Sequence, residues 1–366
     1  MATIAFTGGG TGGHIYPGLA VIEAIRAQNP GTQLFWIGSG KESERNAVEQ
    51  AGIEYYAIAS GKLRRSFSLK NFFDIFRILK GIYQAKKILK TLKADMLFSK
   101  GGYVSVPPCI AAARLKIPVI THESDVSPGL ATKINLRFAD KLIVSWDETL
   151  TFLKPHEQTK TLVLGNPIRK TITQGNRQRG RAFLGLDINM PLLLVLGGSQ
   201  GAEQINKLIE AVAPRLTEQM CIAHQTGQGK PTSIPNSTRY LQFPYLVQEL
   251  PDVLAAADII VCRAGAGTLW ECTAAHKPMI LIPLCGSGTR GDQVENTKIL
   301  VKNNAAMGLI GEEANPEKLL QAILHLLNNH ELQQSMPQNA QKLLRIDAAE
   351  HIATLCLNYC KTGNEQ

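Results

Sequence analysis

A glycine-rich loop close to the N-terminus restricts the possible folds of this chain more than any other stretch. Residues 3–7 are a β-branched and aromatic run, which is typical of a buried strand. Five glycines within residues 8–13 follow directly, and residues 15–28 then carry apolar side chains at helical spacing. Backbone amides and the positive end of a helix dipole converge at such a turn, so the loop is predicted to bind a phosphate or a sugar.

Two polar motifs at expected strand ends are candidate functional groups. His14 ends the glycine loop, at the point where a polar side chain reaches the mouth of the expected site. Residues 122–125, His-Glu-Ser-Asp, place three titratable groups directly after another expected strand, where they need solvent or partners. For His14 the alternative is a hydrogen-bonded structural histidine, and for the glycines it is a tight turn that needs backbone freedom.

The first half of the chain alternates expected strands with expected helices, which indicates a doubly wound parallel sheet. After residues 3–7, strands are expected at 33–37, 55–58, 96–98, 118–121 and 141–145, and helices at 43–50, 106–114 and 129–138. Ligands bind beyond the carboxyl ends of the strands in sheets of this kind. Residues 8–14, 100–103 and 122–125 all follow strands, so they are predicted to surround one crevice.

The second half repeats this plan. Residues 164–190 are polar and rich in arginine, which favours a linker; a strand at 192–196, glycines within 197–201 and a helix at 202–213 follow. Further strands are expected at 222–225, 239–242, 259–262 and 279–282, and helices at 246–256, 268–275, 293–303 and 316–328. The sequence therefore predicts two similar α/β domains. A last helix over about 338–360 is expected to dock through its apolar side chains, and it could pack back on the first domain.

Composition excludes several other classes of protein. The 366 residues are 44% hydrophobic and 19% charged, which is ordinary for a globular chain with room for two cores. No apolar run reaches the roughly 18 residues that span a bilayer, and the N-terminus lacks a signal-peptide pattern. The seven cysteines form no Cys-x-x-Cys pair, and no His, Cys, Asp or Glu cluster has metal-binding spacing. A cytosolic protein with reduced thiols and no metal centre is expected.

One segment carries the whole net charge of +9. Residues 62–93 contain ten Lys or Arg and a single acid, Asp74, whereas the rest of the chain has 29 basic and 29 acidic residues. The segment also has an apolar stripe at helical spacing. Three interpretations stay open: a helix on an anionic lipid surface, a helix whose stripe faces the core, and nucleic-acid binding. The residues expected at a membrane are Arg64, Arg65, Phe72, Phe73, Phe76, Arg77, Lys80, Lys86 and Lys87.

The expected second domain has polar groups suited to a sugar nucleotide. Ser199 adds a hydroxyl to the second glycine loop. Glu271 follows a third glycine turn, at residues 263–268, either as a helix cap or as an acceptor for the two hydroxyls of a ribose. Gln293 and Asn296 share one helix face and suit sugar hydroxyls, although amides are also common on helix surfaces.

Seven motifs together resemble the MurG family of bacterial glycosyltransferases. They occur in the same order at residues 7–14, 101–105, 122–125, 165–169, 197–202, 263–271 and 290–293. The resemblance covers residues 3 to about 349 and implies the GT-B fold, in which two Rossmann-like domains face each other across a cleft. Residues 1–163 would bind the acceptor and the membrane, residues 164–339 would bind UDP-GlcNAc, and residues 340–366 would return to the first domain.

The resemblance also implies a reaction. N-acetylglucosamine would move from UDP-GlcNAc to the C4 hydroxyl of the muramic acid of lipid I, with inversion, giving lipid II and UDP for peptidoglycan synthesis. No metal or cofactor and no nucleic acid is expected. The protein would act at the cytoplasmic face of the plasma membrane, on an anionic lipid surface, with cell-wall synthesis proteins as candidate partners.

Residue roles follow from the same resemblance. The general base would be His14 or Glu123, and Tyr103 and His122 would position the acceptor. Some family members have Gln-Asn where this chain has Ser124-Asp125, so this chain presents a carboxylate in place of an amide donor. The donor would be bound by Thr11, Gly12, Gly13, Asp125, Arg169, Ser199, Val247, Ala266, Gly267, Thr268, Leu269, Trp270, Glu271, Gln293 and Asn296.

Three other functions are weighed against this one. An NAD-dependent oxidoreductase would use similar glycine loops, but the strand at 33–37 leads into Gly38-Ser39-Gly40 without an acidic partner for the ribose. A sugar-binding protein without catalysis would keep the two domains. A glycosyltransferase with a different lipid or small-molecule acceptor would keep the chemistry as well.

Overall fold

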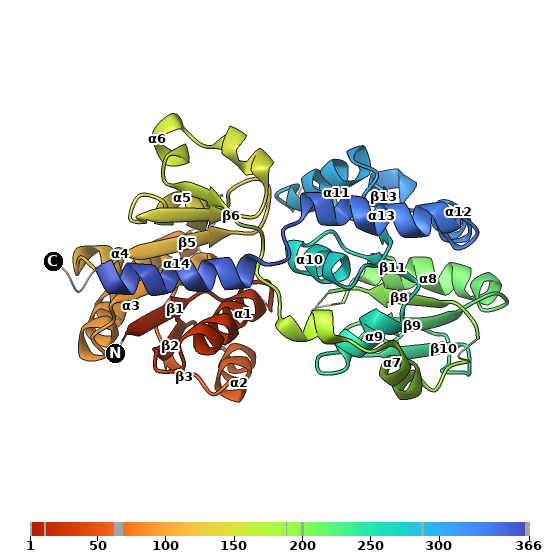
Figure 1. The fold of residues 1–366 in the computed structure, drawn as a ribbon, viewed down its shortest axis with the longest axis horizontal. Helices are drawn as coiled ribbons and strands as arrows, with labels where there is room; N and C mark the ends of the chain where they lie inside the picture. Colours follow the sequence, from red (N-terminus) through yellow and green to blue (C-terminus); the bar gives the residue numbers. More distant parts are fainter. Residues whose placement is uncertain are drawn as a thin grey trace. The chain divides into compact units, whose positions relative to one another are not determined.

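The chain divides into two units, each built on its own parallel sheet (Figure 1). A computed structural model describes residues 2–10, 12–61, 69–187, 189–198, 201–286 and 289–362, with the backbone alone for residues 69–73 and 361–362. Unit 1 comprises Met1–Arg169 and Asp347–Gln366, and unit 2 comprises Lys170–Ile346. The expected pair of doubly wound α/β domains is confirmed.

The sheet of unit 1 has seven parallel strands in the order β3-β2-β1-β4-β5-β6-β7. They are β1 (Thr3–Thr7), β2 (Gln33–Gly38), β3 (Glu54–Ala57), β4 (Met96–Ser99), β5 (Val119–Glu123), β6 (Lys141–Val144) and β7 (Thr161–Val163). Side chains alternate between the two faces of a strand. Ile4 and Phe6 therefore enter one core and Ala5 enters the other.

Helices cover both faces of this sheet. The core with Ile4 and Phe6 includes residues of α1 (Gly12–Gln28), α2 (Glu42–Gln50) and α14 (Ala348–Thr362). The core with Ala5 includes residues of α3 (Leu69–Thr91) and α4 (Val106–Arg114). Shorter elements complete the unit: α5 (Leu130–Asn135), α6 (Pro155–Gln158), and 3₁₀ helices at Tyr103–Ser105 and Asp147–Phe152.

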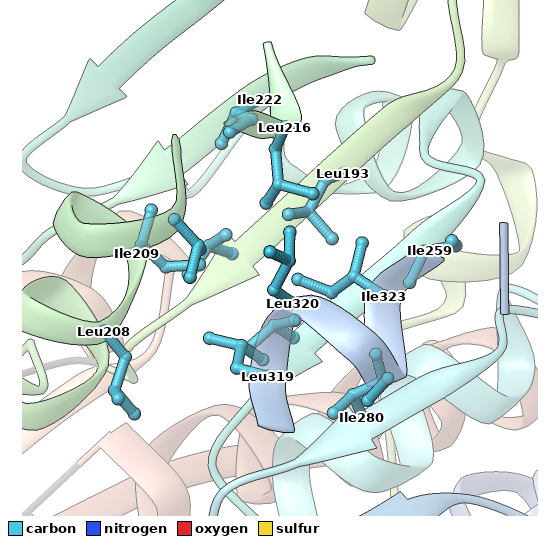
Figure 2. Packing of buried hydrophobic residues seen from close by; sticks show 14 of the residues in the cluster. Leu193, Leu208, Ile209, Leu216, Ile222, Ile259, Ile280, Leu319, Leu320 and Ile323 are labelled. Atoms are coloured by element: carbon cyan, nitrogen blue, oxygen red, sulfur yellow. The ribbon is translucent and has the colours of Figure 1, made fainter. Parts of the chain in front are cut away.

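Unit 2 has six parallel strands in the order β10-β9-β8-β11-β12-β13. They are β8 (Leu192–Leu196), β9 (Cys221–Gln225), β10 (Tyr240–Phe243), β11 (Ile259–Cys262), β12 (Met279–Leu281) and β13 (Met307–Gly308). The helices are α7 (Arg177–Leu184), α8 (Glu203–Leu216), α9 (Leu250–Ala256), α10 (Ala266–Ala274), α11 (Asp292–Lys302), α12 (Pro316–Leu327) and α13 (His330–Leu343), with 3₁₀ helices at Lys170–Gln174 and Gly311–Glu313. Figure 2 shows Leu193 of β8 packed with Leu216 of α8 and Leu320 of α12 in one fully buried core.

The predicted linker at 164–190 is wrong for its second half, which contains α7. Asn176 caps this helix by accepting a hydrogen bond from the Arg179 backbone at 2.9 Å, and Gly185 ends it with φ +60°. Its arginines form ion pairs, since Arg179 lies 2.8 Å from Asp252 and the buried Arg181 lies 2.9 Å from Asp258.

The single helix predicted over about 338–360 is two helices, α13 and α14. The chain leaves helical geometry at Leu344, whose φ and ψ are −106° and 109°. Just past this break, the carbonyl of Arg345 accepts a hydrogen bond from the Trp270 indole at 2.9 Å. The following helix, α14, packs against α1 in unit 1.

Candidate active site

Three predicted loops meet at the carboxyl ends of β1, β4 and β5, which are neighbours in the sheet. His14 Nδ1 lies 3.3 Å from the carbonyl oxygen of Lys100, and Lys100 Nζ lies 3.0 Å from His122 Nδ1. The strand order therefore places the glycine loop, residues 100–103 and residues 122–125 in contact, as the sequence predicts.

His14 belongs to α1 and not to the loop before it, because the helix already begins at Gly12. Gly12 and Gly13 are its first two residues, while Thr11 lies outside the described residues. A carbonyl oxygen only accepts hydrogen bonds, so His14 Nδ1 carries the proton in its contact with Lys100 and Nε2 holds the lone pair. In this tautomer the half-buried, neutral imidazole has its basic nitrogen at Nε2.

Gly102 allows the two neighbouring loops to approach each other. Its φ is +78°, and a Cβ at this position would lie 2.8 Å from the carbonyl oxygen of Gly9 and 3.2 Å from His14 Nε2. The half-buried Tyr103 lies against Gly10, where an added Cβ would meet the ring at 3.0 Å. Any side chain at Gly102 would therefore separate His14 from these loops.

Glu123 is buried, and its carboxylate receives four hydrogen bonds. Oε1 accepts from the backbone amides of Ser124 at 3.0 Å and Asp125 at 3.2 Å. Oε2 accepts from the amide of Gly129 at 2.8 Å and from the Thr132 hydroxyl at 2.6 Å. The carboxylate therefore holds the turn after β5 and has donors at both oxygens.

His122 is also buried, with 1% of its surface exposed. Its Nε2 lies 2.9 Å from the carbonyl oxygen of Gly165, and its Nδ1 faces the ammonium of Lys100. Burial and the neighbouring Lys100 charge hold the pKa of His122 well below its usual range. The side chain is therefore a neutral part of the scaffold beneath the site, and Asp125 at the half-buried end of the turn is more accessible.

Arg169 lies in unit 1, at its boundary with unit 2. Its guanidinium stands 5.2 Å from the centre of the Tyr16 ring, within the range of a cation–π interaction. Arg169, which is predicted to contact the sugar-nucleotide donor, therefore has its side chain packed on α1.

The second glycine loop is held by a residue that the sequence analysis missed. Gln225, at the end of β9, donates to the carbonyl oxygen of Gly198 at 3.2 Å and accepts from the Leu246 amide at 3.0 Å. It thereby connects the loop to the segment containing the half-buried Val247. A polar residue at the end of a buried strand is the signal that could have found it. Ser199 lies outside the described residues.

The third glycine turn leads into α10, with Ala266, Gly267 and Thr268 in its first turn and the half-buried Glu271 after them. The side chains of Leu269 and Trp270 are fully buried, and the Leu269 amide donates to the Gly265 carbonyl at 3.1 Å, so neither side chain faces a ligand.

Two predicted sugar-binding amides also shape this region. Asn296 is fully buried and donates to the carbonyl oxygen of Ala264 at 3.0 Å, which holds the turn from behind. The half-buried Gln293 accepts from the Leu284 amide at 2.9 Å, and its Nε2 points toward Gly265.

The basic helix α3 has two faces of different character. Ile82, Ala85 and Leu89 enter the core of unit 1. On the other side, four apolar side chains are 49–73% exposed: Ile75, Phe76, Leu79 and Tyr83. Phe76 and Leu79 of the predicted stripe therefore do not face the core. The nearby Arg77, Lys80, Lys86 and Lys87 are exposed, Arg64 and Arg65 lie outside the described residues, and of Phe72 and Phe73 only the backbone is described.

The described part of the chain has neither a membrane-spanning helix nor a cluster of metal-binding side chains. None of its helices is both long and apolar enough to cross a membrane. No three of its His, Cys, Asp or Glu side chains are grouped so that they could hold a metal ion. The seven cysteines are free thiols, six of them buried, as expected for reduced residues.

Two parallel-sheet units with glycine turns at helix N-termini match the GT-B fold of glycosyltransferases. The model of the glycosyltransferase family 28 N-terminal domain matches residues 4–144, and that of the C-terminal domain matches residues 192–352. The chain belongs to glycosyltransferase family 28.

Two curated relatives carry one name, UDP-N-acetylglucosamine--N-acetylmuramyl-(pentapeptide) pyrophosphoryl-undecaprenol N-acetylglucosamine transferase. The protein from Treponema pallidum is 43% identical over 334 residues, covering 89% of this chain and 87% of its own. The protein from Treponema denticola is 41% identical over 390 aligned positions, covering 100% of both. The crystal structure of Acinetobacter baumannii MurG is 25% identical with a TM-score of 0.73, covering 98% of this chain and all of its own.

Proposed function

We propose that this protein transfers N-acetylglucosamine from UDP-GlcNAc to the C4 hydroxyl of the muramic acid of undecaprenyl-pyrophosphoryl-MurNAc-pentapeptide. Identity of 41–43% to transferases of that name, across nearly the whole chain, is the observation that carries the proposal. Unit 1 would receive the lipid-linked acceptor and unit 2 the sugar nucleotide, giving lipid II and UDP.

Unit 2 would hold the donor through its glycine turns. Negative charge develops on the departing diphosphate, and backbone amides at the starts of α8 and α10 suit it electrostatically. The half-buried carboxylate of Glu271 would accept hydrogen bonds from the ribose hydroxyls. Arg169 would add a positive charge for the leaving group.

His14 would act as the general base. The C4 hydroxyl oxygen attacks the anomeric carbon while the bond from that carbon to the diphosphate oxygen breaks, and the hydroxyl proton passes to His14 Nε2. A single displacement of this kind inverts the anomeric carbon, and UDP leaves with the electron pair. The hydrogen bond from Nδ1 to the Lys100 carbonyl supports this tautomer. Glu123, with four donors at its carboxylate, would hold the turn and not take the proton.

The exposed face of α3 would bind the anionic surface of the membrane that carries the acceptor. Half-exposed apolar side chains beside exposed lysines are typical of a helix that lies in a lipid interface. Each basic residue near an anionic surface contributes about 1 kcal/mol, so three of them contribute on the order of 3 kcal/mol. Unit 1 would thereby meet a substrate that cannot leave the bilayer.

The test of the transfer is UDP release from UDP-GlcNAc, with and without a short-chain lipid I analogue, in EDTA. We expect release that depends on the acceptor and survives chelation. His14→Ala should lower kcat by about 10²–10⁴-fold, the usual contribution of a general base. His156→Ala, which removes an exposed histidine of unit 1, is the matched control. Binding of UDP-GlcNAc without release would indicate a different acceptor, and no binding would refute the proposal.

The test of the membrane surface is co-sedimentation with anionic vesicles. The variant Lys80→Gln/Lys86→Gln/Lys87→Gln should bind about 100-fold more weakly, and turnover of a water-soluble acceptor should change little. Phe76→Ser should also weaken vesicle binding. Phe152→Ser, which removes an apolar ring of similar exposure elsewhere in unit 1, is its control. Equal vesicle binding by all variants would refute this role of α3.

A further inference from the structure

Lys100 is a buried cation that none of the roles above explains. It follows β4 directly, and 1% of its surface is exposed. Lysine is almost never buried to this extent without a partner that compensates its charge. Its position between the glycine loop and the turn after β5 places it at the centre of unit 1's part of the site.

The hydrogen bonds of its ammonium connect two segments beneath the site. His122 Nε2 donates its proton to the Gly165 carbonyl, so His122 Nδ1 is the acceptor for Lys100 Nζ at 3.0 Å. Lys100 Nζ also donates to the hydroxyl of Ser124, which in turn donates to Asn166 Oδ1 at 3.1 Å. One ammonium therefore bonds both His122, in the tautomer that the Gly165 carbonyl sets, and Ser124.

Both of these hydrogen-bond partners are uncharged. Burial lowers the pKa of Lys100 to about 8, and the nearby carboxylates of Glu123 and Asp125 oppose that shift. The carboxylate of Glu123 already has four donors. Asp125, half-buried at the end of the same turn, is the second carboxylate whose negative charge acts on the ammonium.

The backbone of Lys100 serves the site as well, since its carbonyl oxygen receives the Nδ1 proton of His14. We propose that Lys100 is a positioning residue whose ammonium fixes His122 and Ser124 and balances the charge of Asp125, so that the turn presents an ionised carboxylate beside His14. The proposal rests on the function proposed above, in which His14 and Asp125 act on the substrates.

The experiment compares Lys100→Met, Asp125→Asn and the double variant. Methionine fills the space of the lysine stem without its charge. Loss of a charged hydrogen-bonding group should lower kcat of Lys100→Met by about 10- to 100-fold. If Lys100 compensates Asp125, the double variant should be no worse than Lys100→Met, because the carboxylate that the ammonium attracts is then absent as well. If the two effects multiply, the compensation is refuted.

The pH profile separates this role from simple packing. The titratable groups near the ammonium are His122, Glu123 and Asp125 on β5 and its turn, while His14 on α1 contacts the backbone carbonyl of Lys100. Wild-type kcat should fall as the pH rises through about 8, where the ammonium loses its proton, and Lys100→Met should lack this fall. The control is Lys277→Met: Lys277 is a mostly buried lysine of unit 2 whose pKa burial also lowers to about 8. The Lys277→Met protein should keep the fall in kcat above about pH 8.

Each outcome decides one of the two proposals. An unchanged pH profile in Lys100→Met refutes the positioning role even where His14→Ala abolishes transfer. Absence of transfer by the wild type refutes the proposed function. In that case thermal unfolding of the same four proteins still measures the coupling between Lys100 and Asp125, and additive shifts in Tm would refute it.

Discussion

We expect Glu123→Gln to destabilise unit 1 as well as to slow the reaction. The substitution keeps the size of the side chain but replaces one acceptor oxygen by an NH₂ group. Four donors point at the wild-type carboxylate, two at each oxygen. The NH₂ group of the glutamine side chain must therefore face two hydrogen-bond donors in place of the carboxylate oxygen that accepted from them.

The geometry indicates which side that is. The Thr132 hydroxyl can rotate and accept, whereas the amides of Ser124, Asp125 and Gly129 cannot. The NH₂ group should replace Oε2, leaving the Gly129 amide without its acceptor at a cost of about 1–3 kcal/mol. The remaining bonds lose their charge assistance at about 1 kcal/mol each, so the total is on the order of 3–5 kcal/mol.

Scanning calorimetry measures this directly. For a unit of this size each kcal/mol lowers Tm by about 2–4 °C, so a fall of roughly 6–20 °C is expected. Fluorescence gives a local signal, because the Trp146 indole donates to the Ser124 carbonyl at 3.1 Å. Thr132→Val removes a single donor and should cause a smaller fall. A Glu123→Gln protein that keeps its Tm within about 1 °C but loses kcat would refute the structural role and restore Glu123 as the base.

Three further predictions concern other parts of the chain. Burial lowers the pKa of His224 to about 4, so the folded state binds fewer protons than the unfolded state between pH 4 and 6.5. Unit 2 should therefore lose about 3 kcal/mol of stability as the pH falls through that window. In urea titrations the His224→Gln protein should lack this loss. Gly102→Ala should lower both Tm and kcat because its Cβ would meet the Gly9 carbonyl at 2.8 Å. The control is Gly185→Ala, which is also at positive φ but has no atom within 4 Å of the added Cβ. It should lower Tm alone, by a smaller amount. Ile352→Ala in α14 should cost about 2–5 kcal/mol in denaturant unfolding of unit 1, and an unchanged midpoint would contradict the packing of this helix.

The two sheets could be predicted because parallel strands covered on both faces leave a strong signal in sequence. Residues 192–196 are a continuous apolar run, and the structure buries all five in β8. Glycine turns after such strands similarly predict helix N-termini, and α1 and α10 begin there. The loops that follow parallel strands lie at the same edge of a sheet. From this rule and the order of the loops along the chain, the sequence could predict that His14 lies near His122.

Helix ends were less predictable, because distant residues decide them. Just after α13 ends, the Arg345 carbonyl is bonded to the indole of Trp270, which is 75 positions away in sequence. The helix α7 was missed because its arginines resemble a solvated linker until Asp252 and Asp258 of unit 2 pair with them. Its cap, Asn176, was visible in the sequence, and more weight on that signal would have found the helix.

The sequence by itself determined that polar groups gather after strands, since strand, turn and helix patterns are local. Only the tertiary structure decided which of those groups face a ligand and which hold the scaffold. His122 and Glu123 end one strand and are both buried, Asn296 supports a turn from behind, and Lys100 lies beneath the whole cluster. Burial and hydrogen-bond partners come from segments far apart in the chain, and no periodicity in the sequence records them.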